Sequence, residues 1–342
     1  MQTNIFLIVV LLGIAACKQV KKKPSSEFVR NAHSMVYHQK EASVYLFGGA
    51  SEKEVLNDLW VLKDSSWSYV KAENGPAPRT FASMVYDKKN ERIILFGGSR
   101  VLFGKEVSSE NLLNDTWELK NDRWKKIDTR KSPIARAEAE TVFHNERGSI
   151  ILFGGYVIDG GKYLKLGDTW EFSENEWRPV SSEGPSPRHG VSMGYDFLNQ
   201  HIVLFGGSTE DKQYGESEGQ TWVFKNDHWS MINTVQPSGV YNASMAYHKK
   251  TNEFIRFGGW NGDRRINETW SYKKENWNKL PVQNSPNPRN HSRMIYDEKR
   301  DRILLFGGHN GTEVFGDLWE FRDYKWNKII NGKPKTRVEN HH

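Results

Sequence analysis

The sequence holds only one cysteine among 342 residues, and that residue, Cys17, lies near the N-terminus. Long amphipathic helical patterns are also missing, and short apolar runs bounded by glycine, proline, asparagine and aspartate take their place. The sequence contains no phosphate-binding glycine loop, no metal-ligand spacing and no nucleophile–base signature. These absences argue against a helical fold, a nucleotide-phosphate site and a metal centre. The short apolar runs indicate an all-β protein.

A basic stripe of the kind that binds nucleic acid is lacking as well. The formal net charge is +6, but four lysines against one glutamate in residues 18–29, and three basic residues against one acid in residues 331–342, account for all but +1 of it. The segment between them, residues 30–330, is therefore close to neutral. Binding of a phosphate backbone across the body of the protein is not expected.

One long apolar run does occur, the N-terminal segment "IFLIVVLLGIAA" at residues 5–16. It is too short for a membrane span and has the length of a signal-peptide core. The sequence "GIAAC" at its end resembles a bacterial lipobox, which implies cleavage before Cys17 and lipidation of its thiol. We therefore predict a signal peptide at 1–16, a lipidated Cys17 with a flexible basic tether at 17–29, and an exported protein anchored to the lipid bilayer of the cell envelope.

Tryptophan is abundant, and twelve of the thirteen tryptophans form pairs seven residues apart. The pairs are 60/67, 117/124, 170/177, 222/229, 270/277 and 319/326. Each pair follows a strand-like run that ends in Phe-Gly-Gly, and the first glycines are Gly48, Gly97, Gly154, Gly206, Gly258 and Gly307. The steps between these glycines are 49, 57, 52, 52 and 49 residues. The chain is therefore built from six sequence repeats of similar length.

Each repeat opens eighteen residues before its first glycine. The residues at this position are Arg30, Arg79, Arg136, Arg188, Val240 and Arg289. Each unit predicts four antiparallel strands, a to d: strand a follows the opening residue, strand b ends in the glycine pair, and strands c and d carry the two tryptophans. Short polar tracts such as "KND" at residues 120–122 supply the c–d turns. The tryptophan rings would pack between units. We expect the opening arginines to be structural. The acid before the first tryptophan of each pair, replaced by Gln220 in the fourth unit, is expected to be structural too, for example as an acceptor of backbone N–H groups.

The pattern resembles the Kelch-repeat β-propeller family, in which a glycine doublet after an apolar strand is followed by aromatic residues at this spacing. The resemblance, shared with the repeats of the galactose oxidase central domain, implies an all-β, six-bladed propeller with four antiparallel strands per blade. The propeller would span residues 30–330, with blades at about 30–75, 79–132, 136–184, 188–236, 240–285 and 289–330 and a C-terminal tail at 331–342. Because each blade is one contiguous unit, we expect a monomer whose ring closes by packing between the first and last blades.

Loop lengths indicate which face of this propeller binds a ligand. The distance from the glycine pair to the first tryptophan varies between 12 and 20 residues, whereas the other spacings are nearly constant. In an antiparallel blade this b–c connection lies on the same rim as the d–a connection, so the variable loops gather on one face. We predict that this face binds a protein or a glycan.

Candidate binding residues lie just after the glycine pairs or just after the blade-opening positions. Trp260 is the one tryptophan outside the pairs, and a tryptophan close to Arg264 and Arg265 can stack on a sugar or anchor a peptide. The predicted binding residues are Asn31, Thr80, Arg100, Phe103, Tyr156, His189, Tyr241, Trp260, Arg264, Arg265, Asn290, His291, His309 and Asn310. Together with His33, the histidines of this set come from three different units and lack ligand spacing, so we predict neither a metal site nor a cofactor.

Enzymes of this fold provide an alternative. The copper radical oxidases of the propeller class need a cysteine cross-linked to tyrosine, and the position of Cys17 at the signal site excludes that chemistry. A sugar-acting enzyme of the sialic-acid mutarotase type is the other precedent, and Glu138 with Arg136 would be its acid–base residues here. A purely structural envelope protein is a third reading. The leading hypothesis is a non-catalytic ligand-binding module on the cell envelope.

Overall fold

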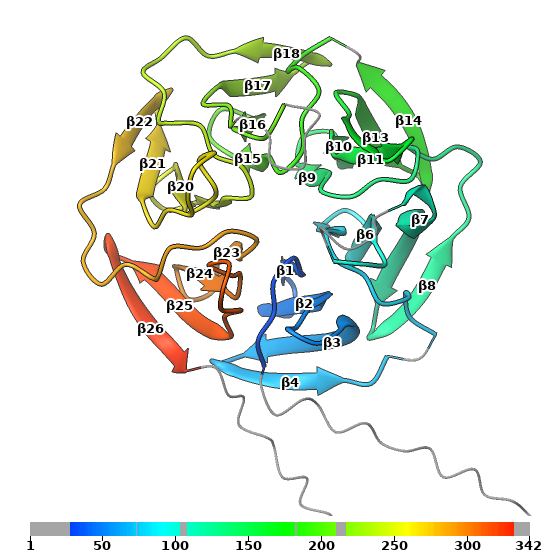
Figure 1. The fold of residues 1–342 in the computed structure, drawn as a ribbon, viewed down its shortest axis with the longest axis horizontal. Helices are drawn as coiled ribbons and strands as arrows, with labels where there is room; N and C mark the ends of the chain where they lie inside the picture. The colour runs from blue at the N-terminus through cyan, green and yellow to red at the C-terminus, as the bar shows by residue number, and fades with distance from the viewer. Residues whose placement is uncertain (1–27, 73, 103–107, 182, 210–216, 332–342) are drawn as a thin grey trace, which may run out of the picture.

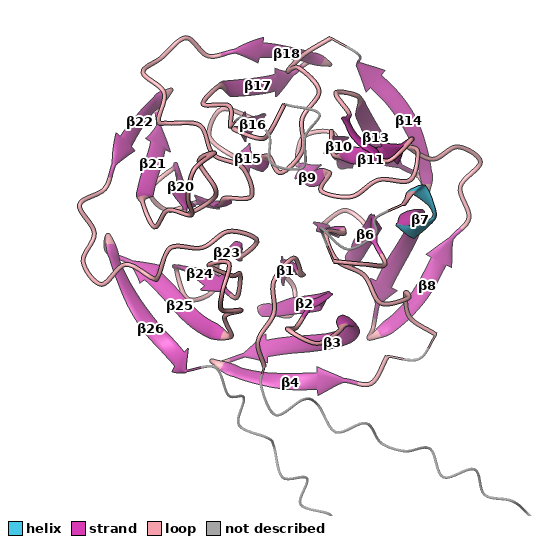
Figure 2. Cartoon of the chain, viewed as in Figure 1, coloured by secondary structure: helices cyan, strands magenta, loops and turns pink. Residues whose placement is uncertain are grey.

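The computed structural model describes residues 28–72, 74–102, 108–181, 183–209 and 217–331. Six four-stranded antiparallel sheets stand around a central axis, and the chain passes through them in order from blade 1 (blue) to blade 6 (red) in Figure 1. The first strand of each blade lies nearest the axis and the fourth forms the outer rim (Figure 2). The predicted six-bladed propeller is confirmed. Within the described ranges, no helix is long and apolar enough to cross a membrane.

The strands follow the predicted units. Blades 1 and 2 contain β1 (Ser34–His38), β2 (Ser43–Ala50), β3 (Val55–Lys63), β4 (Ser66–Val70), β5 (Ser83–Asp87), β6 (Arg92–Ser99), β7 (Leu112–Lys120) and β8 (Arg123–Ile127). Blades 3 and 4 contain β9 (Glu140–His144), β10 (Ser149–Phe153), β13 (Thr169–Ser173), β14 (Glu176–Ser181), β15 (Ser192–Asp196), β16 (His201–Phe205), β17 (Thr221–Lys225) and β18 (His228–Met231). Blades 5 and 6 contain β19 (Ser244–His248), β20 (Glu253–Phe257), β21 (Thr269–Lys273), β22 (Asn276–Lys279), β23 (Arg293–Asp297), β24 (Arg302–Phe306), β25 (Asp317–Arg322) and β26 (Lys325–Asn331). A short 3-10 helix, η1 (Ser109–Asn111), precedes β7, and a hairpin of β11 (Tyr156–Asp159) and β12 (Lys162–Lys165) fills the β10–β13 connection.

The second strand of each blade is buried along its whole length, because both of its faces pack against neighbouring blades. This explains why these strands read as continuous apolar runs rather than as alternating ones. The glycine that follows each run adopts a positive φ and lies against the backbone of the next blade. At Gly206, with φ 77°, a Cβ atom would lie 2.3 Å from the carbonyl oxygen of Val240. Glycine is therefore required at this position, where the backbones of two neighbouring blades are in close contact.

The second tryptophan of each pair joins its blade to the preceding one. All six of these tryptophans are buried. Each packs on the Phe-Gly-Gly phenylalanine of the preceding blade at a ring-centroid distance of 4.7–5.3 Å, as Trp326 does on Phe257. The Nε1–H of Trp326 also donates to Oγ1 of Thr269 in the preceding blade at 3.0 Å. The predicted packing of tryptophan between units is thus carried by the outer strands.

The blade-opening arginines are buried and make one repeated clamp. In blade 6, Arg289 donates through Nη1 to the carbonyl oxygen of Gly307 and forms a two-pronged ion pair with Asp317. The same carboxylate accepts the indole N–H of Trp319 at 2.7 Å. The repeated acid is therefore structural, as expected. It receives guanidinium and indole groups, and Asp58 and Asp168 accept a backbone N–H as well.

Blade 5 lacks the opening arginine, and a different arginine replaces it. Val240 occupies the opening position, while Arg256 on β20 stands where the other second strands carry leucine. The Arg256 side chain is fully buried and its Nη1 approaches the carbonyl oxygen of Gly258 at 3.4 Å. That carbonyl corresponds to the one that the opening arginine reaches in the other blades. Two departures from the repeat, at Val240 and Arg256, thus compensate each other.

The ring closes where the N-terminal lead-in meets blade 6. The N–H of Arg30 donates to the carbonyl oxygen of Phe315, and its own carbonyl accepts from the N–H of Gly308, each at about 3 Å. Phe28 inserts its ring between the two terminal blades, 4.6 Å from that of Trp60 and 5.3 Å from that of Phe306. Closure therefore depends on packing between blades 1 and 6, without a strand shared between them.

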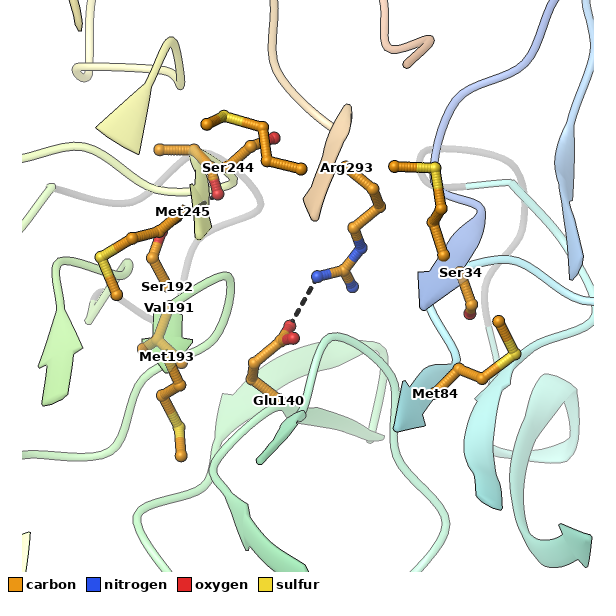
Figure 3. Close-up of a pocket in the computed structure, with 12 residues that line it drawn as sticks. Ser34, Met84, Glu140, Val191, Ser192, Met193, Ser244, Met245 and Arg293 are labelled. Carbon is orange, nitrogen blue, oxygen red and sulfur yellow. Dashed lines mark hydrogen bonds and ion pairs between the residues drawn. The ribbon is translucent and has the colours of Figure 1, made fainter. Parts of the chain in front are cut away.

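The innermost strands line an axial channel, and a cavity of about 110 Å³ lies in it. Methionine occupies the second position of five of these six strands, at Met35, Met84, Met193, Met245 and Met294. Serine occupies the first position in four of them, and the two exceptions are Glu140 and Arg293. These two side chains pair with each other across the channel at 2.8 Å, between blades 3 and 6 (Figure 3). The two departures from serine therefore form one brace.

The far end of the channel, on the a–b turn side, opens into a mouth lined by aromatic residues. A tyrosine or phenylalanine occupies the fourth position of every innermost strand. Phe197, in the β15–β16 turn, is 37% exposed and carries Lys249 over its ring at 4.5 Å. This mouth lies opposite the b–c loops, and its exposed phenylalanine offers a control position for experiments on them.

Candidate functional site

Six residues, one from each blade, form a closed ring of backbone hydrogen bonds around the axis. They stand two positions after the blade-opening residue and are Ala32, Phe81, Glu138, Gly190, Asn242 and His291. Each donates its N–H to the carbonyl oxygen of the corresponding residue in a neighbouring blade, at 2.7–3.3 Å, until the circle is complete. All six have φ between 53° and 65°, which is the left-handed helical region. Residues other than glycine are strained in this region, and the surrounding structure must hold them there. The ring therefore fixes both the radius of the channel and the directions of its side chains.

A cavity of about 280 Å³ lies over this ring, on the b–c loop side. Eight of the residues that the sequence singled out line it: Asn31, Glu138, Tyr241, Trp260, Arg265, Asn290, His291 and His309. Five others complete the wall: Phe81, Leu102, Asn242, Gly311 and Val314. Phe81 and Asn242 share the register position of Glu138, two places after the blade-opening residue, and the sequence placed that position on this face. Gly311 and Val314 correspond to Gly262 and Arg265 in the equally long loop of unit 5, so an alignment of these two loops could have found them. No such signal marks Leu102, which lies in the longest of the six loops.

The remaining predicted binding residues do not line the cavity. Tyr156 begins the inserted hairpin β11–β12 and is buried there, packed against Tyr163 of the second hairpin strand and against His189. Thr80 is buried and donates to the carbonyl oxygen of Val101. Three loop residues, Arg100, Arg264 and Asn310, lie away from the lining, and Phe103 lies outside the described residues. The prediction that Tyr156 contacts a ligand on this face is not supported, because its side chain is buried.

A directional chain of hydrogen bonds crosses the floor of the cavity. Oε2 of Glu138 accepts from Nδ1 of His189 at 2.6 Å and from Nδ2 of Asn242 at 3.1 Å. Nδ2 of Asn242 also meets Nε2 of His291 at 2.7 Å, and Nδ1 of His291 meets Nε2 of His309 at 3.0 Å. Because an amide nitrogen only donates, Nε2 of His291 accepts, and the proton of His291 resides on Nδ1 and is donated to His309.

The charge states of these groups agree with that direction. Burial lowers the pKa of His291 to about 4, although the charge of Glu138 opposes the shift. Burial, together with His291 and Arg265, lowers the pKa of His309 to about 3. Burial alone would raise the pKa of Glu138, but its charge interaction and hydrogen bond with His189 lower it to about 2. Near neutral pH the floor therefore presents one carboxylate beside two neutral imidazoles.

The wall of the cavity is built by a tight loop of blade 5. Trp260 and Arg265 face each other across this loop as a β-bridge, and the guanidinium lies over the indole ring at 4.9 Å. Nε of Arg265 donates to Oδ1 of Asn290 in blade 6 at 2.9 Å. On its other side the loop is tied to blade 4, where Oγ of Ser217 donates to the carbonyl oxygen of Trp260. Loops of three successive blades thus hold this aromatic–cation pair at the cavity.

The acid–base pair suggested by the sequence is not assembled. Glu138 lines the cavity, but the guanidinium of Arg136 turns away from it and bonds both carboxylate oxygens of Asp168 and the carbonyl of Gly154. Arg136 therefore belongs to the blade clamp. Among the described residues, no group of three or more His, Cys, Asp and Glu side chains is arranged to hold a metal ion.

Comparison with known proteins places the repeats in a family. The family model for the KLHDC2/KLHL20/DRC7 Kelch-repeats domain matches residues 14–178 and 147–342. Similar proteins include Kelch domain-containing protein 10 of Xenopus tropicalis, 25% identical over 283 residues that cover 74% of this chain and 65% of that protein. The leucine-zipper-like transcriptional regulator 1 homolog of Drosophila melanogaster is 27% identical over 291 residues, which cover 77% of this chain and 28% of that protein.

Partial matches point the same way. Adagio-like protein 3 of Oryza sativa subsp. japonica is 29% identical over 180 residues, 48% of this chain and 27% of that protein. In each of these relatives the chain covers less than two thirds of the length. The match of the family model across both halves, together with six blades of the expected build, shows that this chain belongs to the Kelch-repeat β-propeller family.

Proposed function

We propose that this protein is an interaction module that binds a peptide segment of a partner protein in the cavity at the b–c face. The observation that supports this most is the convergence of variable loops over a fixed floor. Leu102, Trp260 and Val314 come from the b–c connections of three blades and line one cavity, beneath which the backbone ring is closed. Such a combination of rigid scaffold and variable loops is typical of binding sites.

The composition of the cavity favours a peptide. Tryptophan, tyrosine and arginine are the residues that dominate protein-binding energetics, and Trp260, Tyr241 and Arg265 line this cavity together. Trp260 is half-buried and lines the cavity, with the Arg265 guanidinium over its ring. A cavity of about 280 Å³ has room for one or two side chains of an extended segment. A glycan remains an outcome that the experiment below can return. Since Arg136 is engaged in a blade clamp, the acid–base enzyme is not proposed.

Selection from a displayed library of random peptides tests this proposal. We expect the wild-type chain to enrich a peptide family, and Trp260→Ala to weaken binding of that family by roughly thirtyfold, the effect of losing a buried aromatic anchor. Phe197→Ala, which removes an exposed aromatic residue from the opposite mouth, should leave the affinity unchanged. Isothermal titration with the enriched peptides measures both variants.

Three results would contradict the proposal. The library could yield no peptide that needs Trp260, the Phe197 variant could be the one that loses binding, or a glycan array could give a Trp260-dependent ligand where peptides give none. Each result would show that the b–c cavity is not a peptide-binding site. The binding site would then lie on another face, or the ligand would belong to another chemical class.

We also propose that the protein acts at the cell envelope, held there by a lipid on Cys17. The support is the lipobox-like sequence alone, because Cys17 lies outside the described residues. Replacement of Cys17 by alanine is expected to move the protein from the membrane fraction to the soluble fraction. Metabolic labelling with a radioactive fatty acid, followed by fractionation, measures both consequences. If the variant is not labelled but stays in the membrane fraction, a lipid on Cys17 is not what anchors the protein.

A further inference from the structure

Glu138 is the only described residue of the backbone ring with an ionised side chain. Its side chain is 3% exposed, and both hydrogen bonds that it makes go to Oε2, from His189 and Asn242. Oε1 has no hydrogen-bond partner among the described residues, and Nε2 of His291 lies 3.8 Å from it. Oε1 is therefore an unpaired carboxylate oxygen of a residue that lines the cavity, and neighbouring side chains cover it, so a ligand group reaches it only when these side chains move aside.

Neighbouring histidines do not supply that partner. Nε2 of His291 accepts from Asn242 and carries no proton to give, and the chain of hydrogen bonds runs outward from there to His309. Arg265, the other charged residue of the lining, contacts Trp260 and Asn290. An unpaired oxygen of a buried carboxylate is costly, so a ligand that supplies a donor to it gains more than the same contact would give in water.

A cation fits this position better than a neutral donor does. A hydroxyl group would give Oε1 one hydrogen bond, whereas an ammonium or guanidinium group gives a charge-assisted bond that is roughly twice as strong. The aromatic rings of Phe81, Tyr241 and Trp260 line the same cavity, and aromatic faces attract cations. One of these rings already carries a guanidinium, that of Arg265.

We propose that the cavity receives a lysine or arginine side chain of the bound peptide, whose cationic head donates to Oε1 of Glu138. This inference rests on the proposed peptide-binding function and specifies its ligand. The aliphatic stem of the side chain lies along the apolar wall formed by Phe81 and Leu102. Arg265 then faces carbonyl or carboxylate groups of the residues that flank the inserted side chain.

Replacement of Glu138 by glutamine separates charge from shape. The glutamine carbonyl can keep both inner hydrogen bonds, from His189 and Asn242, while its NH₂ group turns toward the cavity and presents a donor where the ligand also donates. Glu140→Gln is the matched control, because Glu140 lies two residues further along, pairs with Arg293 in the channel and does not line the cavity. Both variants keep the backbone ring, which involves no side chain.

The experiment repeats the library selection with the full-length wild-type chain, the Glu138 variant and the Glu140 variant. We expect wild-type and Glu140→Gln protein to enrich peptides with one invariant lysine or arginine, and Glu138→Gln to bind them at least about tenfold more weakly. A synthetic peptide in which that lysine is replaced by norleucine or by acetyl-lysine should lose a similar factor on the wild type. Titration calorimetry gives each affinity.

Failure of this inference is distinguishable from failure of the proposed function. Peptides that need Trp260 but carry no invariant basic residue, or that bind Glu138→Gln as well as wild type, would overturn the cation site and leave peptide binding in place. If no peptide requires Trp260 for binding, the proposed peptide-binding function is contradicted, and so is the cation site that depends on it.

Discussion

Replacing Arg289 with alanine is expected to lower the free energy of unfolding by about 3–5 kcal/mol, the usual cost of breaking a buried ion pair from one side. The Arg289 side chain is 0% exposed and that of its partner Asp317 is 11% exposed. Burial would raise the pKa of Asp317, and the hydrogen bonds and charge of Arg289 hold it below its usual range instead. Without the guanidinium, the mostly buried carboxylate of Asp317 keeps, among the described residues, only the indole N–H of Trp319 and the Lys328 ammonium, which lies 3.7 Å away. Urea unfolding followed by tryptophan fluorescence measures the loss.

The same protein supplies the control. Arg188 occupies the equivalent position in blade 4 and reaches the corresponding carbonyl, but its side-chain partners are the neutral Gln220 and Ser186. Arg188→Ala loses a buried side chain and its hydrogen bonds without leaving a charge behind, so we expect a cost of about 2 kcal/mol. Equal losses in the two variants would show that the charge of Asp317 plays no part, and the account of the clamp as an ion pair would be wrong.

Replacing Phe28 with alanine is expected to cost about 3–5 kcal/mol as well, because it removes the aromatic wedge that closes the ring. Phe28 is 4% exposed and contacts Trp60, Trp67 and Phe306, which belong to the first and last blades. Hydrogen exchange should rise first in β1–β4 and β23–β26, since these strands border the seam, and later in the blades opposite.

Val29→Ala provides a matched control at the neighbouring, half-buried position, and a loss under about 1 kcal/mol is expected there. A uniform rise of exchange around all six blades of the Phe28 variant would contradict the seam. It would mean that the ring unfolds as one unit and that closure is not its weak point.

The repeat made the architecture predictable because its spacing is set by backbone geometry. A blade needs a glycine pair where it meets the next blade, and a tryptophan where its outer strand covers the preceding one, so both recur at fixed intervals. The partner of a repeated residue could not be predicted in the same way. Arg289 and Asp317 lie 28 positions apart in the sequence. They meet because the folded chain brings both side chains to the C-terminal end of β24, where Arg289 also donates to the carbonyl oxygen of Gly307.

Departures from the repeat were harder to interpret than the repeat itself. Val240 reads as a lost arginine until Arg256 is seen to reach the same carbonyl from another strand. Glu140 and Arg293 read as two unrelated exceptions until the channel brings them together. In both cases the compensating residues are brought together by the fold, and no regular sequence spacing connects them.

The candidate site was predictable to the extent that it follows the repeat register. The positions after each blade-opening residue pointed to Asn31, Glu138 and His291, because every blade delivers those positions to the axis. The loops beyond the glycine pairs share a register only where their lengths agree, as in units 5 and 6. Tyr156 and Trp260 hold the same position in their units, yet the first begins an extra hairpin and is buried, whereas the second lines the cavity.

Fluorine NMR of protein labelled with 5-fluorotryptophan tests the central claim, ligand binding in the b–c cavity, most directly. Twelve of the thirteen tryptophans belong to the repeat pairs, and Trp260 alone lies outside them, so its resonance can be assigned from the Trp260→Phe variant. On addition of a selected peptide, the account predicts a shift or broadening of the Trp260 resonance with the twelve others nearly unchanged. A bound peptide that leaves the Trp260 resonance in place and moves those of the paired tryptophans would contradict it.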